Sequence, residues 1–191
     1  LFRSLADLRA VGRLKAQQIT GIIEQDFERT ALVASRTKLR ECFRTAALGK
    51  DDVAAQQRTM VRILGDAMAS VDNIRTIHVT DFNGRIVAST KRDATGTVLF
   101  KDNPFRPEKD GFALHRFYEQ KGDLQYDVWV PMADPSAPER NIGFACTVFA
   151  AERIRNVLHD YTGLGRTGEQ LLCRREKDSL LVLGPARHDE T

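Results

Sequence analysis

Helical patterning dominates the first third of the chain. No proline occurs between Leu1 and about Leu48, and apolar residues recur there every 3.6 residues or so, as on one face of an amphipathic helix. The apolar stripe consists of Leu1, Leu5, Leu8, Ala16, Ile19, Ile23 and Phe27. Gly49 is expected to end this helix, and Asp51 or Asp52 to cap a second helix that ends near Ser70. The pattern therefore predicts two long helices, the first of them of the order of 45 residues.

The pattern changes to β-structure at Ile74. Two runs rich in β-branched residues, Ile74 to Asp81 and Arg85 to Thr90, flank Asn83-Gly84. This dipeptide favours a type I′ turn, in which both central residues have a positive φ, so a β-hairpin is predicted. Residues 91–111 contain Gly, Asp, Asn and two prolines and indicate a loop with a short helix.

Further strand-like and helical segments complete an α+β fold. Asn141 to Phe149 is apolar on both faces, which is typical of a central strand. The remaining predicted elements are a strand at 112–119, a turn at 120–123, a strand at 124–132, a surface loop at 133–140, a helix at 150–161, and a last hairpin formed by 167–173 and 180–183 around a turn at 174–179. We expect an N-terminal helical region over 1–72, a sheet module over 73–161, and a separate C-terminal piece over 162–191.

Composition limits the class of protein. The 191 residues, 42% of them hydrophobic, suffice for one globular domain or slightly more. The formal net charge is only +3, and basic and acidic residues alternate, so no nucleic-acid partner is predicted. The longest apolar run, Ile142 to Ala151, has about half the length that a membrane helix needs, and no signal-peptide pattern opens the chain. Its two ends are interpreted as those of a segment from a longer protein.

Motifs for catalysis are lacking. The three cysteines have no metal or redox spacing and are interpreted as small buried hydrophobes, with reactive thiols as the less favoured alternative. The four histidines form no metal-binding pattern, and no serine stands in a nucleophile elbow. Gly163 to Gly168 has the spacing of a dinucleotide-binding loop, but a helix is expected before it and a strand after it, the reverse of what such a site requires. We therefore predict no catalytic residues, no metal, no cofactor and no enzymatic activity of the domain itself.

A group of aromatic and basic residues suggests a ligand site. Aromatic walls with a guanidinium and an imidazole suit a small anionic or zwitterionic molecule. The candidates are Phe105, Arg106, His115, Phe117, Tyr126 and Trp129. The competing interpretation is that the aromatic residues belong to the core and that the basic residues are solvated. Strand alternation places Tyr126 on one face, with Asp127 and Trp129 together on the other.

The order of these motifs resembles a known family. Two long helices, then Asp81 to Thr90, then Val130 to Asp134, then Ile142 to Phe144, resemble the Cache (PDC, PAS-like) extracytoplasmic sensor domains. The run Gly163 to Leu172, followed by Pro185 to Asp189, is similar to the start of the second, membrane-proximal module of double-Cache proteins. The resemblance thus implies a PAS-like antiparallel sheet behind the long helices, and a second, truncated module at the C-terminus.

The resemblance also implies a function. It predicts a small-molecule-sensing input domain on the periplasmic or extracellular side of the inner membrane, in a membrane-anchored sensor histidine kinase that signals through helix displacement. A diguanylate cyclase or a chemoreceptor is the alternative parent, and a structural dimerisation module that binds no ligand is the alternative function. The expected partners are a small ligand, with organic acids among the candidates, and a second copy of the chain.

Overall fold

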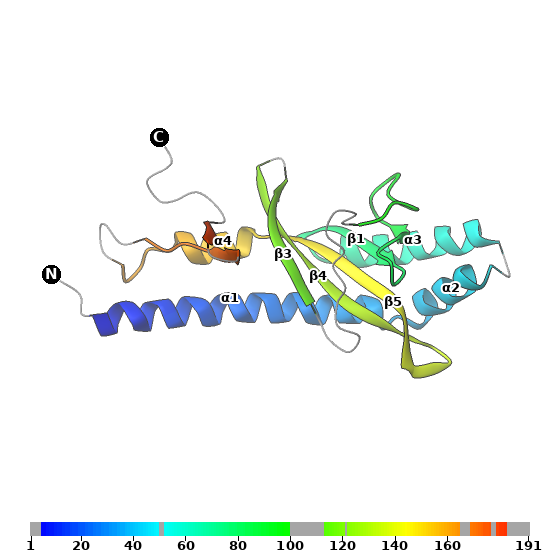
Figure 1. Ribbon diagram of the computed structural model, residues 1–191, viewed down its shortest axis with the longest axis horizontal. Helices are drawn as coiled ribbons and strands as arrows, with labels where there is room; N and C mark the ends of the chain where they lie inside the picture. Colours follow the sequence, from blue (N-terminus) through cyan, green and yellow to red (C-terminus); the bar gives the residue numbers. More distant parts are fainter. Residues whose placement is uncertain are drawn as a thin grey trace. The chain divides into compact units, whose positions relative to one another are not determined.

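The computed structural model describes residues 5–49, 52–99, 113–120, 122–164, 169–176 and 179–182 (Figure 1). The chain divides into two compact units. The first unit comprises Leu1–Gln25, Phe117–Gln125 and Ala150–Thr191, and the second comprises Asp26–Arg116 and Tyr126–Phe149. The domain boundaries expected from the sequence stay a prediction, and each unit is described by itself.

The N-terminal helical region has three helices instead of the two expected. They are α1 (Leu5–Ala34), α2 (Thr37–Leu48) and α3 (Val53–Ala69). The single long helix predicted up to Leu48 is wrong, because the chain leaves helical geometry at Arg36, whose ψ is 114°. The break gives α2 its own direction, and Leu39 and Phe43 of α2 are at most 2% exposed. Burial of these two side chains therefore outweighs continuation of α1.

Both predicted helix signals around the α2–α3 connection are confirmed. Gly49 adopts a left-handed conformation, with φ of 61°, and its N–H donates to Ala46 O, which ends α2. Asp52 precedes α3, and its carboxylate accepts a hydrogen bond from the backbone N–H of Ala55 at 3.1 Å. This N-cap satisfies one of the donors that a helix start leaves without an intrahelical partner.

Five strands form one sheet in the order β2-β1-β5-β4-β3. The strands are β1 (Ile74–Thr80), β2 (Ile86–Ser89), β3 (Ala113–Gln120), β4 (Asp123–Asp134) and β5 (Ala137–Ala150). The central position predicted for residues 141–149 is confirmed, since β5 lies in the middle of the order. Long N-terminal helices together with an antiparallel sheet confirm the predicted α+β class.

The predicted β1–β2 hairpin is confirmed, but its turn differs from the one expected. In the described part of the chain Asp93 is the only non-glycine residue with a positive φ, so Asn83 does not take the conformation of a type I′ turn. Within this turn only Gly84 has a positive φ, of 73°. Its N–H donates to Asp81 O. The Asp81 carboxylate accepts from the backbone N–H groups of Asn83 and Arg85 at 2.8 and 2.9 Å. This side chain stabilises a turn that starts at Asp81.

A β-hairpin replaces the surface loop predicted for residues 133–140. Strand β4 continues to Asp134, and β5 begins at Ala137. The Asp134 carboxylate accepts from Ser136 N at 2.9 Å and from Arg140 Nη2 at 2.5 Å. The prolines at 135 and 138 suggested a loop, but the buried Asp134 side chain holds a tight turn and both strand ends together.

The first unit contains α4 (Glu152–His159), which confirms the predicted helix. It also contains the hairpin of β6 (Cys173–Glu176) and β7 (Ser179–Val182). Residues 174–176 were predicted to lie in the turn of this hairpin, but they belong to β6. Lys15 of α1 is 6% exposed and forms an ion pair with Asp160 after α4. Arg153 Nη2 donates to Gln25 Oε1 at 2.6 Å, so α4 also contacts α1 through a hydrogen bond.

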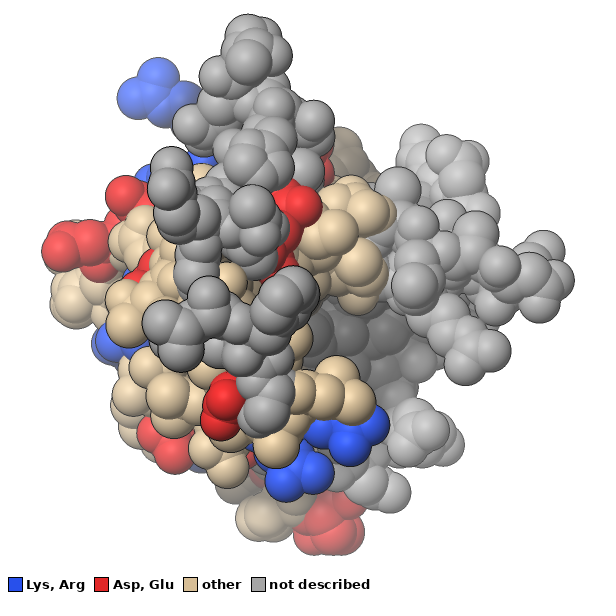
Figure 2. Space-filling view, turned by 90° about the vertical axis from the view of Figure 1, so that its left-hand side faces the viewer, with Lys and Arg blue, Asp and Glu red and all other residues tan. Residues whose placement is uncertain are grey.

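The described residues include no helix that is long and apolar enough to span a bilayer, and no group of three His, Cys, Asp or Glu side chains that could hold a metal ion. On the face shown in Figure 2, acidic and basic side chains are interspersed with uncharged ones.

Cys42 and Cys146 are buried as expected, whereas Cys173 is exposed, contrary to the interpretation of all three as buried.

Candidate ligand-binding site

The two faces of the sheet in the second unit have different neighbours. Gly143 of β5 lies so close to α2 that a Cβ there would be 2.8 Å from Cζ of Phe43. Tyr126 of β4 stacks on Phe149 of β5, and its hydroxyl donates to Asp26 of α1 at 2.5 Å. Because alternate residues of a strand point to opposite faces, residues 126, 143 and 149 define a helix-covered face. We call the opposite face, which carries Asp127, Trp129, Phe144 and Cys146, the site face.

Strand pairing adds two polar residues of β1 to the site face. His78 pairs with Cys146 and Thr80 with Phe144, and directly opposed residues in a sheet have their side chains on the same side. Ser89 of β2 pairs with His78 and joins the group. All of these residues are at most 6% exposed. Four adjacent strands thus gather buried polar side chains around aromatic ones.

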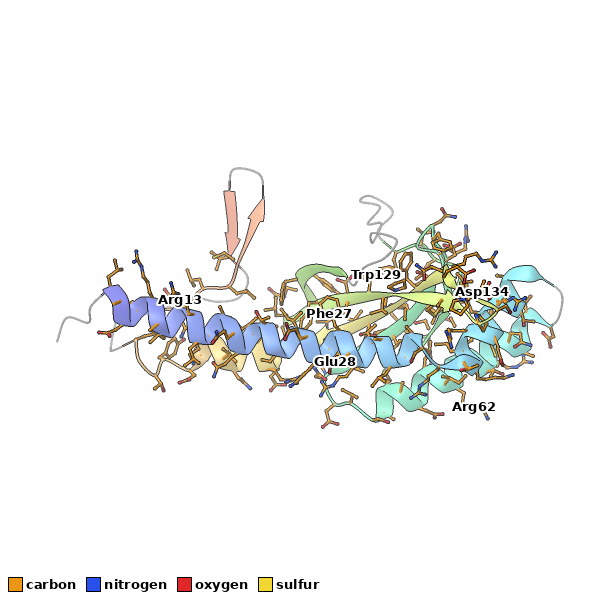
Figure 3. All side chains as sticks on the ribbon, turned by 90° about the horizontal axis from the view of Figure 1, so that it is seen from below. Arg13, Phe27, Glu28, Arg62, Trp129 and Asp134 are labelled. Carbon is orange, nitrogen blue, oxygen red and sulfur yellow. The ribbon has the colours of Figure 1, made fainter. Side chains whose placement is uncertain are left out.

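Trp129 is at the centre of the site face. It packs with Phe144 and Cys146, and partly buried Leu99 lies against this cluster. Its ring is edge-on to Phe144, with 6.2 Å between the centroids. The indole N–H donates to Asp127 Oδ2 at 2.6 Å, which fixes the ring orientation and supports a carboxylate that is 0% exposed. Figure 3 shows the position of Trp129 on the strands. The arrangement offers an apolar wall beside an anionic acceptor.

His78 lies within the electrostatic influence of this carboxylate. Its pKa is lowered to about 4, mainly by burial and secondly by the positive charge of Lys91, whereas Asp127 acts in the opposite direction. The imidazole is therefore neutral at neutral pH. Among the described residues, His78 Nδ1 has no hydrogen-bond partner. A neutral imidazole can donate from one ring nitrogen and accept at the other, so Nδ1 is available to a ligand group of either kind.

Thr80 is a second buried polar group of this kind. It is 0% exposed, and its Oγ1 has no hydrogen-bond partner within the described ranges. A buried hydroxyl without a partner destabilises the fold by about 1 to 3 kcal/mol. Thr80 and His78 are two residues apart on β1, so their side chains share the site face. Two polar atoms that a ligand could satisfy therefore lie on the same face as the Asp127 carboxylate.

The segment after β2 supplies part of the cover over the site face. Ile86 N donates to Thr97 O at 2.8 Å, and Leu99 N donates to Gly84 O at 2.9 Å. The Arg85 guanidinium also donates to Gly96 O at 2.9 Å. These bonds hold residues 96–99 beside the hairpin as an added edge segment, and so place Leu99 against the aromatic cluster.

Of the six predicted site residues, Trp129 and Tyr126 lie on opposite faces of the sheet. Trp129 is on the site face, whereas Tyr126 is on the helix-covered face, hydrogen-bonded to Asp26. Phe117 belongs to β3 in the first unit and is partly buried. His115 lies in β3, but the position of its side chain is outside the described part, as are Phe105 and Arg106 altogether.

Sequence reasoning missed His78, Thr80, Ser89, Phe144 and Cys146 as companions of Trp129. Alternation along β4 already grouped Asp127 with Trp129. Nothing comparable could show which residues of β1 lie opposite which residues of β5, because strand register depends on long-range pairing. His78, which stands between the apolar residues Ile77 and Val79 of β1, was the available signal.

Helices on one face of an antiparallel sheet with this strand order agree with the PAS-like fold that the sequence resemblance implied. No family model matches the sequence, and no curated protein matches it. Similarity to solved structures is found at the level of the fold.

Three such structures have the same fold. The ligand-binding domain of the Pseudomonas aeruginosa amino-acid chemoreceptor PctC, in complex with GABA, has a TM-score of 0.55 and 15% identity over 80% of this chain. The match spans 63% of the PctC domain, so this chain corresponds to less than two thirds of it. The Escherichia coli DcuS sensor domain has a TM-score of 0.54 and 13% identity, over 75% of this chain and 99% of its own. An extracellular ligand-binding receptor from Desulfohalobium retbaense has a TM-score of 0.51 and 13% identity, over 81% of this chain and 27% of its own.

Proposed function

We propose that this chain is a small-molecule-sensing input domain and that its ligand binds on the site face. The observation that carries the proposal is the pair of buried polar atoms, His78 Nδ1 and Thr80 Oγ1, that have no partner among the described residues. They lie on the same face as the Asp127 carboxylate and the Trp129 ring. Buried polar groups are normally satisfied, and a ligand would satisfy these two.

The chemistry of the site face selects a class of ligand. Asp127 is 0% exposed, and a carboxylate oxygen accepts hydrogen bonds, so we match it with a donor group of the ligand, such as an ammonium. Trp129 and Phe144 supply faces and edges for an apolar body, and an indole face also attracts a cation. An amine or an amino acid therefore fits better than a simple dicarboxylate. This narrows the organic-acid expectation to acids that also carry a donor.

The wider assignment follows the fold. The proposal places the domain on the extracytoplasmic side of the inner membrane, in a sensor histidine kinase or, alternatively, in a diguanylate cyclase or a chemoreceptor. Signalling would proceed by displacement of α1, which is tied to the sheet by the hydrogen bond from Tyr126 to Asp26. Homodimerisation is supported by Leu5, Leu8 and Leu14 of α1, which are 42% to 64% exposed. Residues 162–191 would begin a second module.

A structural module that binds nothing is the competing function. It would dimerise through the exposed leucines of α1, and its buried polar atoms would be tolerated defects. The two functions differ in one measurable property. Only a sensor gains stability from a ligand, by about 2.7 kcal/mol at a hundredfold excess over Kd.

Thermal unfolding of the chain with separate sets of amines, amino acids and dicarboxylates tests the proposal. We expect amines or amino acids to raise the melting temperature, and Thr80→Val to abolish that rise. The matched control is Thr147→Val, because Thr147 is equally buried and its Oγ1 equally lacks a described partner. Thr147 pairs with Ile77, so it lies on the helix-covered face.

The possible results of this assay distinguish a sensor domain from a structural module. If Thr147→Val keeps the ligand-induced rise and Thr80→Val loses it, the site face is the binding surface. A rise with dicarboxylates alone would contradict the donor chemistry assigned to the ligand. The absence of a response in all three sets would favour the structural module.

A further inference from the structure

A pocket lies in the second unit, between the end of α2 and the β1–β2 turn. It has a volume of about 350 Å³, within the range of about 300 to 1,000 Å³ that is typical of small-molecule sites. Residues from three elements line it: Phe43, Arg44 and Ala47 of α2, Phe82 of the turn, and Arg140 and Ile142 of β5. It is distinct from the site face and goes beyond the proposed function.

The apolar part of this pocket is built by close packing. Phe43 is 2% exposed and reaches the sheet because Gly143 has no side chain. A Cβ at position 143 would lie 2.3 Å from Thr80 O and 2.8 Å from Phe43 Cζ. Phe82 stands edge-on to Phe144, with their ring centroids 5.7 Å apart. Although held in this way, Phe82 remains 49% exposed. An aromatic side chain that is both held and exposed can form a preformed apolar wall.

The polar part carries an excess of positive charge. Arg140 Nη2 is 2.5 Å from Asp134 Oδ2, and Arg44 Nε is 3.9 Å from Asp134 Oδ1. Arg44 also donates to Ser136 Oγ. Two guanidinium groups therefore share one carboxylate, which leaves one net positive charge. The two arginine side chains are 42% and 68% exposed, whereas that of Asp134 is 1% exposed. Their remaining N–H donors are accessible to a second anion.

We propose that this pocket binds a small molecule with one carboxylate on a short apolar body. The carboxylate would complete the charge balance of Arg44, Arg140 and Asp134, and the apolar body would lie between Phe82, Ile142 and Phe43. The pocket is linked to the site face by ring contacts, since Phe82 of the pocket contacts Phe144 and Phe144 contacts Trp129. Occupancy of the pocket therefore restrains a ring that belongs to the aromatic contacts of the proposed sensor site.

Phenylacetate is a suitable probe, with phenylacetamide as its uncharged counterpart and acetate as the charged group without an apolar body. Each is titrated into the isotope-labelled chain, and backbone amide shifts are followed by NMR. We expect phenylacetate to shift the amides of Phe43, Ala47, Phe82 and Ile142, and to bind about tenfold or more tightly than either control compound. Equal binding of phenylacetate and phenylacetamide would overturn the role of the two arginines.

Two variants with the same added charge test the location. Ala47 lines the pocket and is exposed on α2, so Ala47→Glu places a carboxylate at the pocket without disturbing the core. Ala54 is equally exposed on α3 and does not line it, so Ala54→Glu is the matched control. We expect Ala47→Glu to weaken phenylacetate binding about tenfold and Ala54→Glu to leave it unchanged. Equal affinities of the two variants for phenylacetate would refute the proposal. Amide shifts confined to residues outside the pocket would also refute it, as would binding of acidic peptides without binding of phenylacetate.

Discussion

His78 should make the stability of the domain depend on pH in a range where most other groups do not titrate. Its imidazole is 6% exposed, and burial is the largest cause that lowers its pKa from 6.5 to about 4, followed by the charge of Lys91. Asp127 of β4 raises it and only partly compensates. Between these two pKa values the unfolded chain binds a proton that the folded chain does not bind. The contribution of His78 is therefore fully present above about pH 6.5 and is lost as pH falls towards 4.

The linkage relation gives the size of this effect. With a pKa of 6.5 for the unfolded chain and about 4 for the folded one, the free energy of unfolding should fall by about 2 kcal/mol between about pH 7.5 and about pH 5. The complete loss, reached near pH 3, is about 3 kcal/mol. Asp134 and Asp160 also have lowered pKa values, but their contributions are lost only as pH falls below about 4. Among the described groups with a shifted pKa, His78 is therefore the one whose contribution changes between pH 7.5 and 5.

Urea unfolding at a series of pH values measures this directly. Trp129 is the only tryptophan and is buried on the site face, so its fluorescence reports on unfolding. A change of about 2 kcal/mol moves the urea midpoint by about 1 M. His78→Gln removes the titrating group and should flatten the dependence, whereas His159→Gln, at an exposed position of α4, should preserve it. A wild-type midpoint that does not change between pH 7.5 and 5, or a slope that survives His78→Gln, would refute the reasoning.

Two further predictions concern packing. Gly143→Ala should destabilise the fold by about 1 to 3 kcal/mol or more, because the new Cβ meets backbone and an aromatic ring, whereas Gly65→Ala, in helix α3 with nothing within 4 Å, should stabilise it by about 1 kcal/mol. Chemical denaturation of both variants checks this, and a neutral Gly143→Ala would contradict the close approach of α2 to the sheet. Tyr126→Phe should reduce the free energy of unfolding by about 1.5 to 3 kcal/mol, because it removes a buried hydrogen bond to Asp26. A loss below about 0.5 kcal/mol in the same assay would show that this bond contributes little.

Local chemistry made much of the fold predictable. Gly49, Asp52 and the change to β-branched residues at Ile74 each act within a few residues of the boundary that they set, so the boundaries could be placed from the sequence. The errors arose where tertiary contacts decide. The break at Arg36 depends on burial of Leu39 and Phe43 in the folded chain, which no local pattern reveals.

The two incorrect turns have the same kind of cause. Asn83-Gly84 favours a type I′ turn, but the Asp81 carboxylate accepts two backbone N–H groups and stabilises a different one. Asp134 likewise holds the β4–β5 turn, where two prolines suggested a loop. A short acidic side chain just before a turn was therefore a stronger determinant than the dipeptide or the prolines that follow it.

The site was less predictable than the fold, because burial of a polar residue does not by itself indicate function. Thr147 and Thr80 are both at most 1% exposed, and neither hydroxyl has a partner among the described residues. Only Thr80 shares its face with His78, Asp127 and Trp129, since Thr147 faces the helices. The functional assignment therefore rests on convergence of polar groups on one face, which strand register determines and a single sequence does not reveal. This is why the Thr80→Val and Thr147→Val pair discriminates: the two variants remove the same group at the same burial and differ in the face from which it is removed.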